Sequence, residues 1–321
     1  DYDNKLAEVT YQHERSEEDC SELTHVTIPD TVLRGRVKYA VVSIGSMAFY
    51  KCKTLESIVI PDHIKSIGTN AFSECSALTS VSLPNTITYL NSSLFSNCTA
   101  LRTFTIPDNI TSIYGSVFES CSSLSEINIP SSVTSIGKYA FRYCNSLKSI
   151  TIPNSVKSIY RGAFYKCKAL TDITLPDSLT TVSQEMFYEC TALESITIPI
   201  GVTHIENNAF YWCSNLKTMT LHANIEYIDE WAFNQTSIST YILAMRSAEE
   251  ACTNRVNKIL HDIGQQYSTR KITINGEKVR DLVVPNTIDS ISDYAFAYSY
   301  IASVNIPNNL KRINPTAFYK C

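Results

Sequence analysis

Cysteine is the residue type with the widest chemistry in this sequence, which holds eleven of them among 321 residues. Eight recur at one constant spacing: Cys52, Cys75, Cys98, Cys121, Cys144, Cys167, Cys190 and Cys213. The sequence has no C-x-x-C pair or His/Cys cluster for a metal, and equivalent cysteines on stacked units point the same way, which disfavours a disulfide. We therefore expect a column of buried, reduced thiols that act as small apolar side chains, with Cys20 and Cys252 outside it.

The other reactive residue types form no recognisable constellation. The six histidines share no repeat position, and none has a cysteine or carboxylate at the sequence spacing that a metal site needs. They are His13, His25, His63, His204, His222 and His261. None of the motifs G-x-S-x-G, H-E-x-x-H, G-x-x-x-x-G-K-[ST] or G-x-G-x-x-G occurs. We predict a protein that is not an enzyme, with no catalytic, cofactor-binding or metal-binding residues. The alternative is a catalytic set assembled from distant units, which leaves no local motif.

The charge pattern excludes several classes of partner. The formal net charge is -4, and lysine and arginine are scattered along the chain instead of forming a stripe. This pattern predicts no binding to nucleic acid or to an anionic membrane. No apolar run reaches the roughly 18 residues that a membrane span needs. The chain starts at Asp1 without a leader, so we expect either a cytosolic protein or a secreted one whose signal peptide has been removed.

The cysteines belong to a repeat that must position every other element. Phenylalanine keeps the same period as cysteine, at Phe49, Phe72, Phe95, Phe118, Phe141, Phe164, Phe187, Phe210 and Phe233. The shared template is L-x-x-I-x-I-P-x-x-V-x-x-I-G-x-x-A-F-x-x-C, in which about eight of 23 positions are apolar. Because about eight apolar side chains cannot enclose a core within one unit, the units must stack into one elongated solenoid.

Each 23-residue coil contains three segments. The L-x-x-I-x-I segment alternates apolar and polar residues like a short strand, and the proline after it ends that strand. The V-x-x-I segment is a second short extended piece. In A-F-x-x-C-x-x-L, apolar residues three and four apart predict a short helical turn on the opposite side. The predicted fold is an α/β repeat: a solenoid with short parallel strands on one face and short helical or irregular turns on the other.

The regular array is bounded and interrupted. We divide the chain into an N-terminal cap (1–22), a solenoid (23–243), an amphipathic helical insertion (244–270) and resumed repeats (271–321). The cap includes an alternating stretch at 6–11 that we expect to add a strand to the first coil. That coil has nine extra residues, which predict a hairpin at 34–37.

Apolar residues three and four apart predict the helix of the insertion over 244–267. We expect it to dock on the flank of the solenoid; the alternative is a partner-binding helix. Asn275-Gly276 then predicts a hairpin turn. The chain ends on a cysteine position with no capping segment after it, which predicts association through the exposed apolar end of the last coil.

The repeat template resembles the 23-residue leucine-rich repeat of BspA-like surface proteins. The resemblance covers essentially the whole chain except residues 244–270. It implies a right-handed leucine-rich-repeat solenoid with a parallel sheet on one face. It also implies secretion or cell-surface display, in bacteria of the gut or mouth or in some parasitic protists, and adhesion to host proteins or other cells. The sequence departs from this pattern in its helical insertion and in lacking a lipid-attachment cysteine, sorting motif or anchor.

A candidate interaction surface follows from the strand alternation. The residue two places before each proline position must face away from the core: Ser82, Thr105, Asn128, Thr151, Thr174, Thr197 and Thr220. Solvent-facing strands favour such residues in any case. Aromatic residues just after the core phenylalanine are a second candidate set: Tyr143, Tyr165, Tyr188, Tyr211 and Trp212. Two interpretations stay open for them, recognition of a partner and packing on the next coil.

The function that these features favour is a non-enzymatic, adhesin-like binding module, secreted or at the cell surface. Its expected partners are proteins or glycans of a host or of neighbouring cells. The alternative is a structural spacer or scaffold on the cell surface without a ligand of its own. A cytosolic scaffold is a third, weaker possibility.

Overall fold

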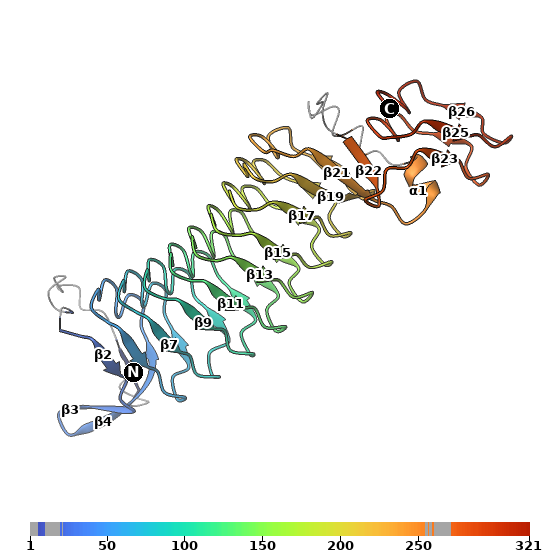
Figure 1. Ribbon diagram of the computed structural model, residues 1–321. Coiled ribbons are helices and arrows are strands. Elements are labelled where there is room, and N and C mark those ends of the chain that lie inside the picture. The colour runs from blue at the N-terminus through green and yellow to red at the C-terminus, as the bar shows by residue number, and fades with distance from the viewer. Residues whose placement is uncertain (1–5, 10–19, 21, 254–255, 257–258, 260–270) are drawn as a thin grey trace.

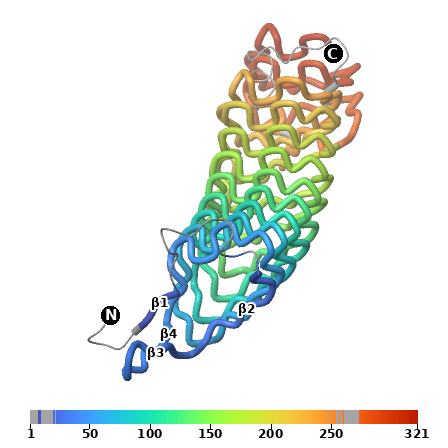
Figure 2. Tube along the Cα trace, turned by 90° about the vertical axis from the view of Figure 1, so that its left-hand side faces the viewer, coloured from blue at the N-terminus to red at the C-terminus, as the bar shows by residue number. Residues whose placement is uncertain are grey.

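The computed structural model describes residues 6–9, 20, 22–253, 256, 259 and 271–321. These residues wind into an elongated β-solenoid, with the N-terminal coils at one extreme and the C-terminal coils at the other (Figure 1). Figure 2 shows the successive coils stacked along the long axis. Paired strands such as those containing Ser112 and Ser135 lie one repeat apart in the sequence, as the template predicts. The handedness stays a prediction.

One line of parallel strands, here called the first ladder, is formed by the I-x-I segments before the proline positions. Its strands are β2 (His25–Thr27), β5 (Ser57–Val59), β7 (Ser80–Ser82), β9 (Thr103–Thr105), β11 (Glu126–Asn128), β13 (Ser149–Thr151), β15 (Asp172–Thr174), β17 (Ser195–Thr197), β19 (Thr218–His222), β21 (Thr240–Ala244), β22 (Lys271–Ile274), β23 (Asp281–Val283) and β25 (Ser303–Asn305). Most of these strands are short because proline follows soon after and cannot donate to a ladder.

A second ladder is formed by the V-x-x-I segments. Its strands are β4 (Val37–Ile44), β6 (Ser66–Ile67), β8 (Tyr89–Leu90), β10 (Ser112–Ile113), β12 (Ser135–Ile136), β14 (Ser158–Ile159), β16 (Thr181–Val182), β18 (His204–Ile205), β20 (Tyr227–Ile228), β24 (Ser290–Ile291) and β26 (Arg312–Ile313). It is also parallel, so parallel strands occupy two sides of the coil and not one face alone.

The segment that carries the core phenylalanine forms a third stacked line, here called the turn ridge. Its alternate N–H groups bond between coils: Phe141 N–H donates to the Ala163 carbonyl at 2.8 Å. The N–H groups between them donate within the coil, as from Ala140 to Gly137. Tyr139 and Tyr143 have φ of 57° and 61°. These left-handed residues break any helical run, so the ridge consists of turns. Of the short helical or irregular turns expected here, the helical ones are not confirmed.

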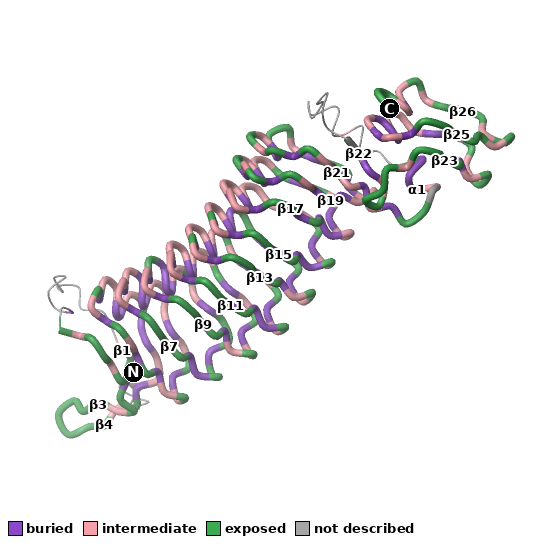
Figure 3. The backbone as a smooth tube through the Cα atoms, viewed as in Figure 1, coloured by how far each residue is buried: buried purple, intermediate pink, exposed green. Residues whose placement is uncertain are grey.

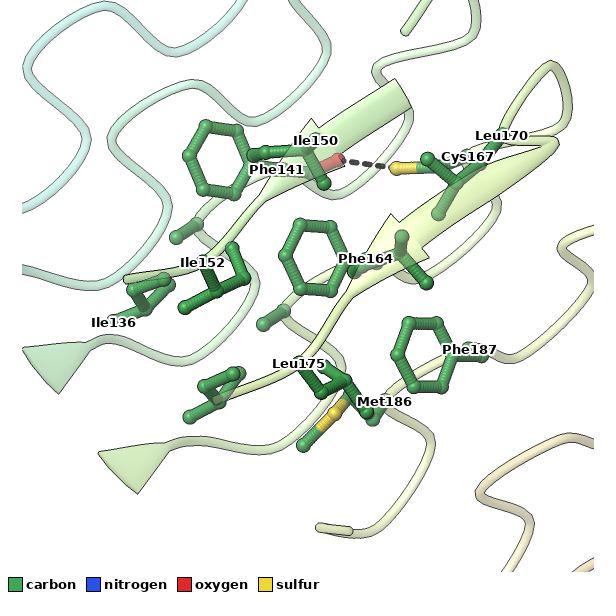
Figure 4. Close-up of a cluster of buried hydrophobic side chains, with 14 of the residues drawn as sticks. Ile136, Phe141, Ile150, Ile152, Phe164, Cys167, Leu170, Leu175, Met186 and Phe187 are labelled. Atoms are coloured by element: carbon green, nitrogen blue, oxygen red, sulfur yellow. Dashed lines mark hydrogen bonds between the residues drawn. The ribbon is translucent and has the colours of Figure 1, made fainter. Parts of the chain in front are cut away.

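The core lies between the three lines, and buried stretches of backbone recur from coil to coil (Figure 3). Within the core, successive phenylalanine rings stack (Figure 4). The rings of Phe141 and Phe164 are 5.5 Å apart and nearly parallel, and Phe164 and Phe187 are 5.7 Å apart. Isoleucine and leucine from the strands surround them, as Ile150 and Leu175 do in Figure 4. The predicted phenylalanine column is therefore present.

The N-terminal end contains the strand and the hairpin that the sequence predicts. β1 (Leu6–Val9) pairs in parallel with β4, within the stretch expected to join the first coil. β3 (Thr31–Arg34) pairs antiparallel with β4, and Arg34 lies opposite Val37. The hairpin at 34–37 is thus confirmed.

The reduced cysteine column needs one correction. Cys20 and Cys52 form a disulfide, with Cα atoms 5.0 Å apart. Stacking disfavours a disulfide only between equivalent cysteines of neighbouring coils, whereas Cys20 approaches Cys52 from outside the repeat. Seven column thiols from Cys75 to Cys213 are free and buried, as predicted.

The interruption of the array contains the helix α1 (Ala248–Thr253). Most of the helix predicted over 244–267 lies outside the described residues. The Cys252 carbonyl accepts a hydrogen bond from Ser292 N–H at 3.0 Å, just as Ile205 accepts one from Asp229 in the regular coils. α1 therefore takes the place of a second-ladder strand, which favours docking over partner binding for this part.

The turn at Asn275-Gly276 is present but its hairpin is minimal. Both residues have positive φ, and Ile274 bridges Glu277. β22 itself pairs in parallel with β21, so it belongs to the first ladder.

Candidate interaction surface

The polar residues predicted to face outward lie side by side on the first ladder. Pairing places Thr105 beside Asn128, Thr151 beside Thr174 and Thr197 beside Thr220. We call the surface formed by Ser82, Thr105, Asn128, Thr151, Thr174, Thr197 and Thr220 the hydroxyl face. All are exposed except Thr220, which is half-buried.

The hydroxyl face differs from other threonine positions in its hydrogen bonds. Thr111 Oγ1 donates to the Thr88 carbonyl at 3.3 Å, and Thr134 Oγ1 donates to Thr111 at 3.1 Å. Such hydroxyls help to join the coils. Among the described residues, the side chains of Thr151 and Thr174 have no such partner. Their hydroxyls are therefore free to bond to water or to a ligand.

A hollow of about 570 Å³ opens on the hydroxyl face at β15 and β17. Thr174 and Thr197 line it together with Asp172, Asp177 and His222. β15 and β17 belong to separate sheets, so the first ladder is interrupted there. The carboxylates and hydroxyls suit a small polar group of a larger partner.

The predicted tyrosines lie on the turn ridge and not on the hydroxyl face. Tyr165 and Tyr188 stack at 4.5 Å between ring centroids, and Tyr188 and Tyr211 stack at 5.0 Å. Tyr143 meets Tyr165 edge to face at 5.9 Å. Because their rings cover one another from coil to coil, the structure favours packing for these four residues. Trp212 is different, since the residue remains 50% exposed.

Cations lie over these rings and are neutralised by neighbouring coils. The Arg142 guanidinium is 4.8 Å from the Tyr143 ring centroid and pairs with Glu119 at 3.1 Å. Lys166 pairs with Glu189 at 3.0 Å. Burial raises the pKa of the Tyr165 phenol. The ridge therefore stabilises coil stacking through aromatic and cation–π contacts.

The scatter expected for lysine and arginine does not hold in the central coils. Residues 127–171 contain seven Lys and Arg residues and no Asp or Glu. Stacking gathers them within neighbouring coils. Arg142, Arg161 and Lys166 pair with acids from flanking coils, whereas the other four have no ion pair among the described residues: Lys138, Lys148, Lys157 and Lys168. A count of charge per repeat would have revealed this concentration.

Exposed aromatic residues of the second ladder were also missed. Tyr114 and Tyr160 follow β10 and β14 and are 46% and 49% exposed. Both occupy the position that holds glycine in the template. A tyrosine in place of that glycine was the signal available in the sequence.

A sequence profile described as the BspA type leucine-rich repeat region matches residues 18–148, 134–254 and 270–321, in six copies. The chain belongs to this family. A search of curated proteins found no match to this BspA-type chain.

Solved structures similar to this BspA-type chain are leucine-rich-repeat proteins. One from Bacteroides ovatus is 23% identical over 93% of this chain and 85% of that one, with a TM-score of 0.45. A leucine-rich cell surface protein from Faecalibacterium prausnitzii is 25% identical over 77% and 92% of the two chains, with a TM-score of 0.37. The leucine-rich-repeat protein of T. pallidum is 26% identical over 60% and 78%, with a TM-score of 0.41.

The described part of this BspA-type chain holds no group of three His, Cys, Asp or Glu side chains placed to bind a metal ion. Within the same residues, no helix has the length and apolar character to cross a membrane.

The association expected at the C-terminal end stays a prediction. In the last coils Ile306 and Ile313 are 49% and 41% exposed.

Proposed function

We propose that this BspA-type chain is a non-enzymatic, adhesin-like binding module, secreted or displayed at the cell surface. Its partner is a protein or glycan of a host or of a neighbouring cell. The observation that carries this proposal is the hydroxyl face, in which Thr151, Thr174 and Thr197 are exposed and, among the described residues, their side-chain hydroxyls form no hydrogen bond between coils. The core does not require these hydroxyls, so their supply of hydrogen-bonding groups is available for recognition.

Two further observations support the proposal. The hollow at Thr174 and Thr197 gives the hydroxyl face a concave point where a partner's polar group can be enclosed. The Cys20–Cys52 disulfide supports an oxidising compartment, because disulfides are rare where thiols are kept reduced.

The test is a binding screen of the purified chain against extracellular host proteins and glycans, repeated with a variant of the hydroxyl face. The triple substitution Thr151→Lys, Thr174→Lys and Thr197→Lys places three bulky charges on the face and should abolish capture of the partner. The matched control, Thr88→Lys, Ser131→Lys and Asn145→Lys, adds the same charges at exposed positions elsewhere. Melting curves check that both variants fold.

Equal capture by the two variants would refute a role for the hydroxyl face. The spacer alternative makes the opposite prediction for a deletion of three central coils. A spacer shortened in this way still functions, whereas a binding module loses its contact surface.

A further inference from the structure

We infer that an interruption of the second ladder, between β14 and β16, is a binding site for an acidic sugar unit of a glycan. We call it the β14/β16 groove. It lies on a different ladder from the hydroxyl face, so the inference goes beyond the proposed function and can hold if the hydroxyl face proves inert.

The hydrogen bonds of the second ladder stop at this place and resume after it. Before it, Lys157 N–H donates to the Thr134 carbonyl at 2.9 Å. After it, Thr203 N–H donates to the Thr180 carbonyl at 2.9 Å. Thr180 N–H has no backbone acceptor among the described residues, and β14 and β16 belong to different sheets. The backbone bonds of the second ladder are therefore missing between these two coils, which leaves one backbone donor unused.

A hollow of about 480 Å³ with a mixed lining lies at this interruption. Tyr160, a residue that is 49% exposed, is part of its wall. Ser158, Thr180 and Gln184 add hydroxyl and amide groups. Ser183 also lines it, but its hydroxyl already donates to the Ile159 carbonyl at 2.6 Å. An aromatic surface beside several polar groups is an arrangement that binds small polar ligands.

The charges of the groove are distributed unevenly. Lys138 and Lys157 line it and have no ion pair among the described residues. Arg161 is held by Glu185 through two bonds of 3.1 and 2.9 Å. Glu206 also lines the groove and accepts from Gln184 N–H at 2.8 Å. The unpaired cations, Lys138 and Lys157, thus lie in the coils before the interruption, and the Glu206 carboxylate lies in a coil after it. This distribution orients an anionic ligand toward the two lysines.

A sugar unit fits this lining better than a peptide does. A peptide strand that extends a sheet needs a row of free backbone donors and acceptors. The strands that flank the groove are very short, and β12 and β18 already pair with them on their outer sides. A sugar ring instead places an apolar face on Tyr160, its hydroxyls on Ser158 and Thr180, and a carboxylate or sulfate on the two lysines.

Binding of oligosaccharides to the full chain tests the inference. The probes are a hyaluronan octasaccharide, which carries only carboxylates, a heparin octasaccharide, which adds sulfates, and neutral maltooctaose. We expect one or both acidic probes to bind and maltooctaose not to bind. The acidic probe that binds identifies the anionic group. Failure of both acidic probes overturns the inference.

Variants distinguish the groove from general attraction to positive charge. Lys138→Gln with Lys157→Gln should weaken binding of the acidic probe by about tenfold. The control, Lys148→Gln with Lys168→Gln, removes two exposed, unpaired cations of the same coils outside the groove and should change binding by less than about twofold. Tyr160→Ala should weaken binding without changing the net charge.

Equal losses in the two lysine variants would show nonspecific electrostatics and overturn the site. Displacement of the oligosaccharide by an acidic peptide at equal concentration would show a peptide site and also overturn it. The triple lysine variant of the hydroxyl face should bind the oligosaccharide normally. A failure of the hydroxyl face can therefore be distinguished from a failure of the β14/β16 groove.

Discussion

The thiol of Cys167 donates a hydrogen bond of 3.0 Å to the carbonyl oxygen of Phe141 in the preceding coil (Figure 4). The same bond recurs along the column, from Cys121 to Phe95 and from Cys144 to Phe118, each at 3.1 Å. The column cysteines are therefore more than small apolar side chains. Each of the seven free column thiols donates to a buried phenylalanine carbonyl of the preceding coil, which also accepts a backbone N–H from its own coil.

Cys144→Ala should lower the free energy of unfolding by about 1–3 kcal/mol, because it removes the donor to Phe118 and leaves a small void. Urea denaturation followed by circular dichroism measures the change. Cys252→Ala is the control, since Cys252 is buried but donates no such bond to a phenylalanine carbonyl among the described residues. Equal losses in both variants would show that the hydrogen bond contributes nothing.

The column thiols should not react in the native protein at neutral pH. Burial raises the pKa of Cys121 and Cys167 from 9.0 to about 12, so almost no thiolate forms. A thiol reagent should label exposed Cys321 first. After denaturation without reductant it should label nine cysteines, and eleven after reduction of the Cys20–Cys52 disulfide. Native labelling of the seven column thiols would contradict their burial.

Alkaline pH should destabilise the fold through the same thiols. A pKa raised in the folded state means that the unfolded chain ionises first. The neutral thiols contribute their full share of the folding stability below about pH 9. This share falls as the pH rises toward 12, the pKa of Cys121 in the folded protein. The urea midpoint should therefore be lower at pH 10.5 than at pH 7.5. A protein whose column cysteines are replaced by alanine should lose this part of the pH dependence.

Phe141→Ala should lower the free energy of unfolding by about 3–5 kcal/mol, because coils that stack rigidly cannot close the cavity. Tyr160→Ala removes an aromatic side chain from the exterior and serves as the comparison. A loss below about 1 kcal/mol for Phe141→Ala would be incompatible with a phenylalanine core.

Gly162→Ala should destabilise the protein by about 1–2 kcal/mol. Gly162 has φ of +60°, and an added Cβ would lie 2.3 Å from the Tyr139 ring. Gly35→Ala is the matched control, because Gly35 has φ of +63° and open space around it. The difference between the two melting temperatures isolates the ring contact. Adding Tyr139→Ala to Gly162→Ala should remove that difference.

The sequence predicts the parts of this fold that depend on local pattern. The strands before proline, the phenylalanine column and the hairpin at 34–37 follow from alternation, period and an insertion of known length. The turns of the ridge do not follow from local pattern, because a helix would show the same spacing of Ala140, Phe141 and Cys144. The choice between helix and turn depends on whether the backbone N–H groups donate within a coil or to the next coil.

The candidate sites were predictable only in part. The hydroxyl face follows from strand alternation alone. The β14/β16 groove depends on where the hydrogen bonds between coils fail, and the Cys20–Cys52 disulfide depends on where a segment outside the repeat returns. Neither is recorded in local spacing. Lys138 and Lys157, which line the groove, belong to neighbouring coils, and stacking brings them to the same hollow.

The three lines of hydrogen bonds between coils also determine how the molecule responds to mechanical tension. These bonds run roughly along the long axis, so a pull between the two ends loads them lengthwise and peels away one coil at a time. Each coil that opens releases about 75 Å of chain. The turn ridge keeps its bonds across the β14/β16 groove, where Phe164 N–H still donates to the Met186 carbonyl at 3.0 Å. In the proposed role as an adhesin-like module, the chain would therefore act as a tether that lengthens in steps and absorbs shock, while the coils that are still wound keep their surfaces intact.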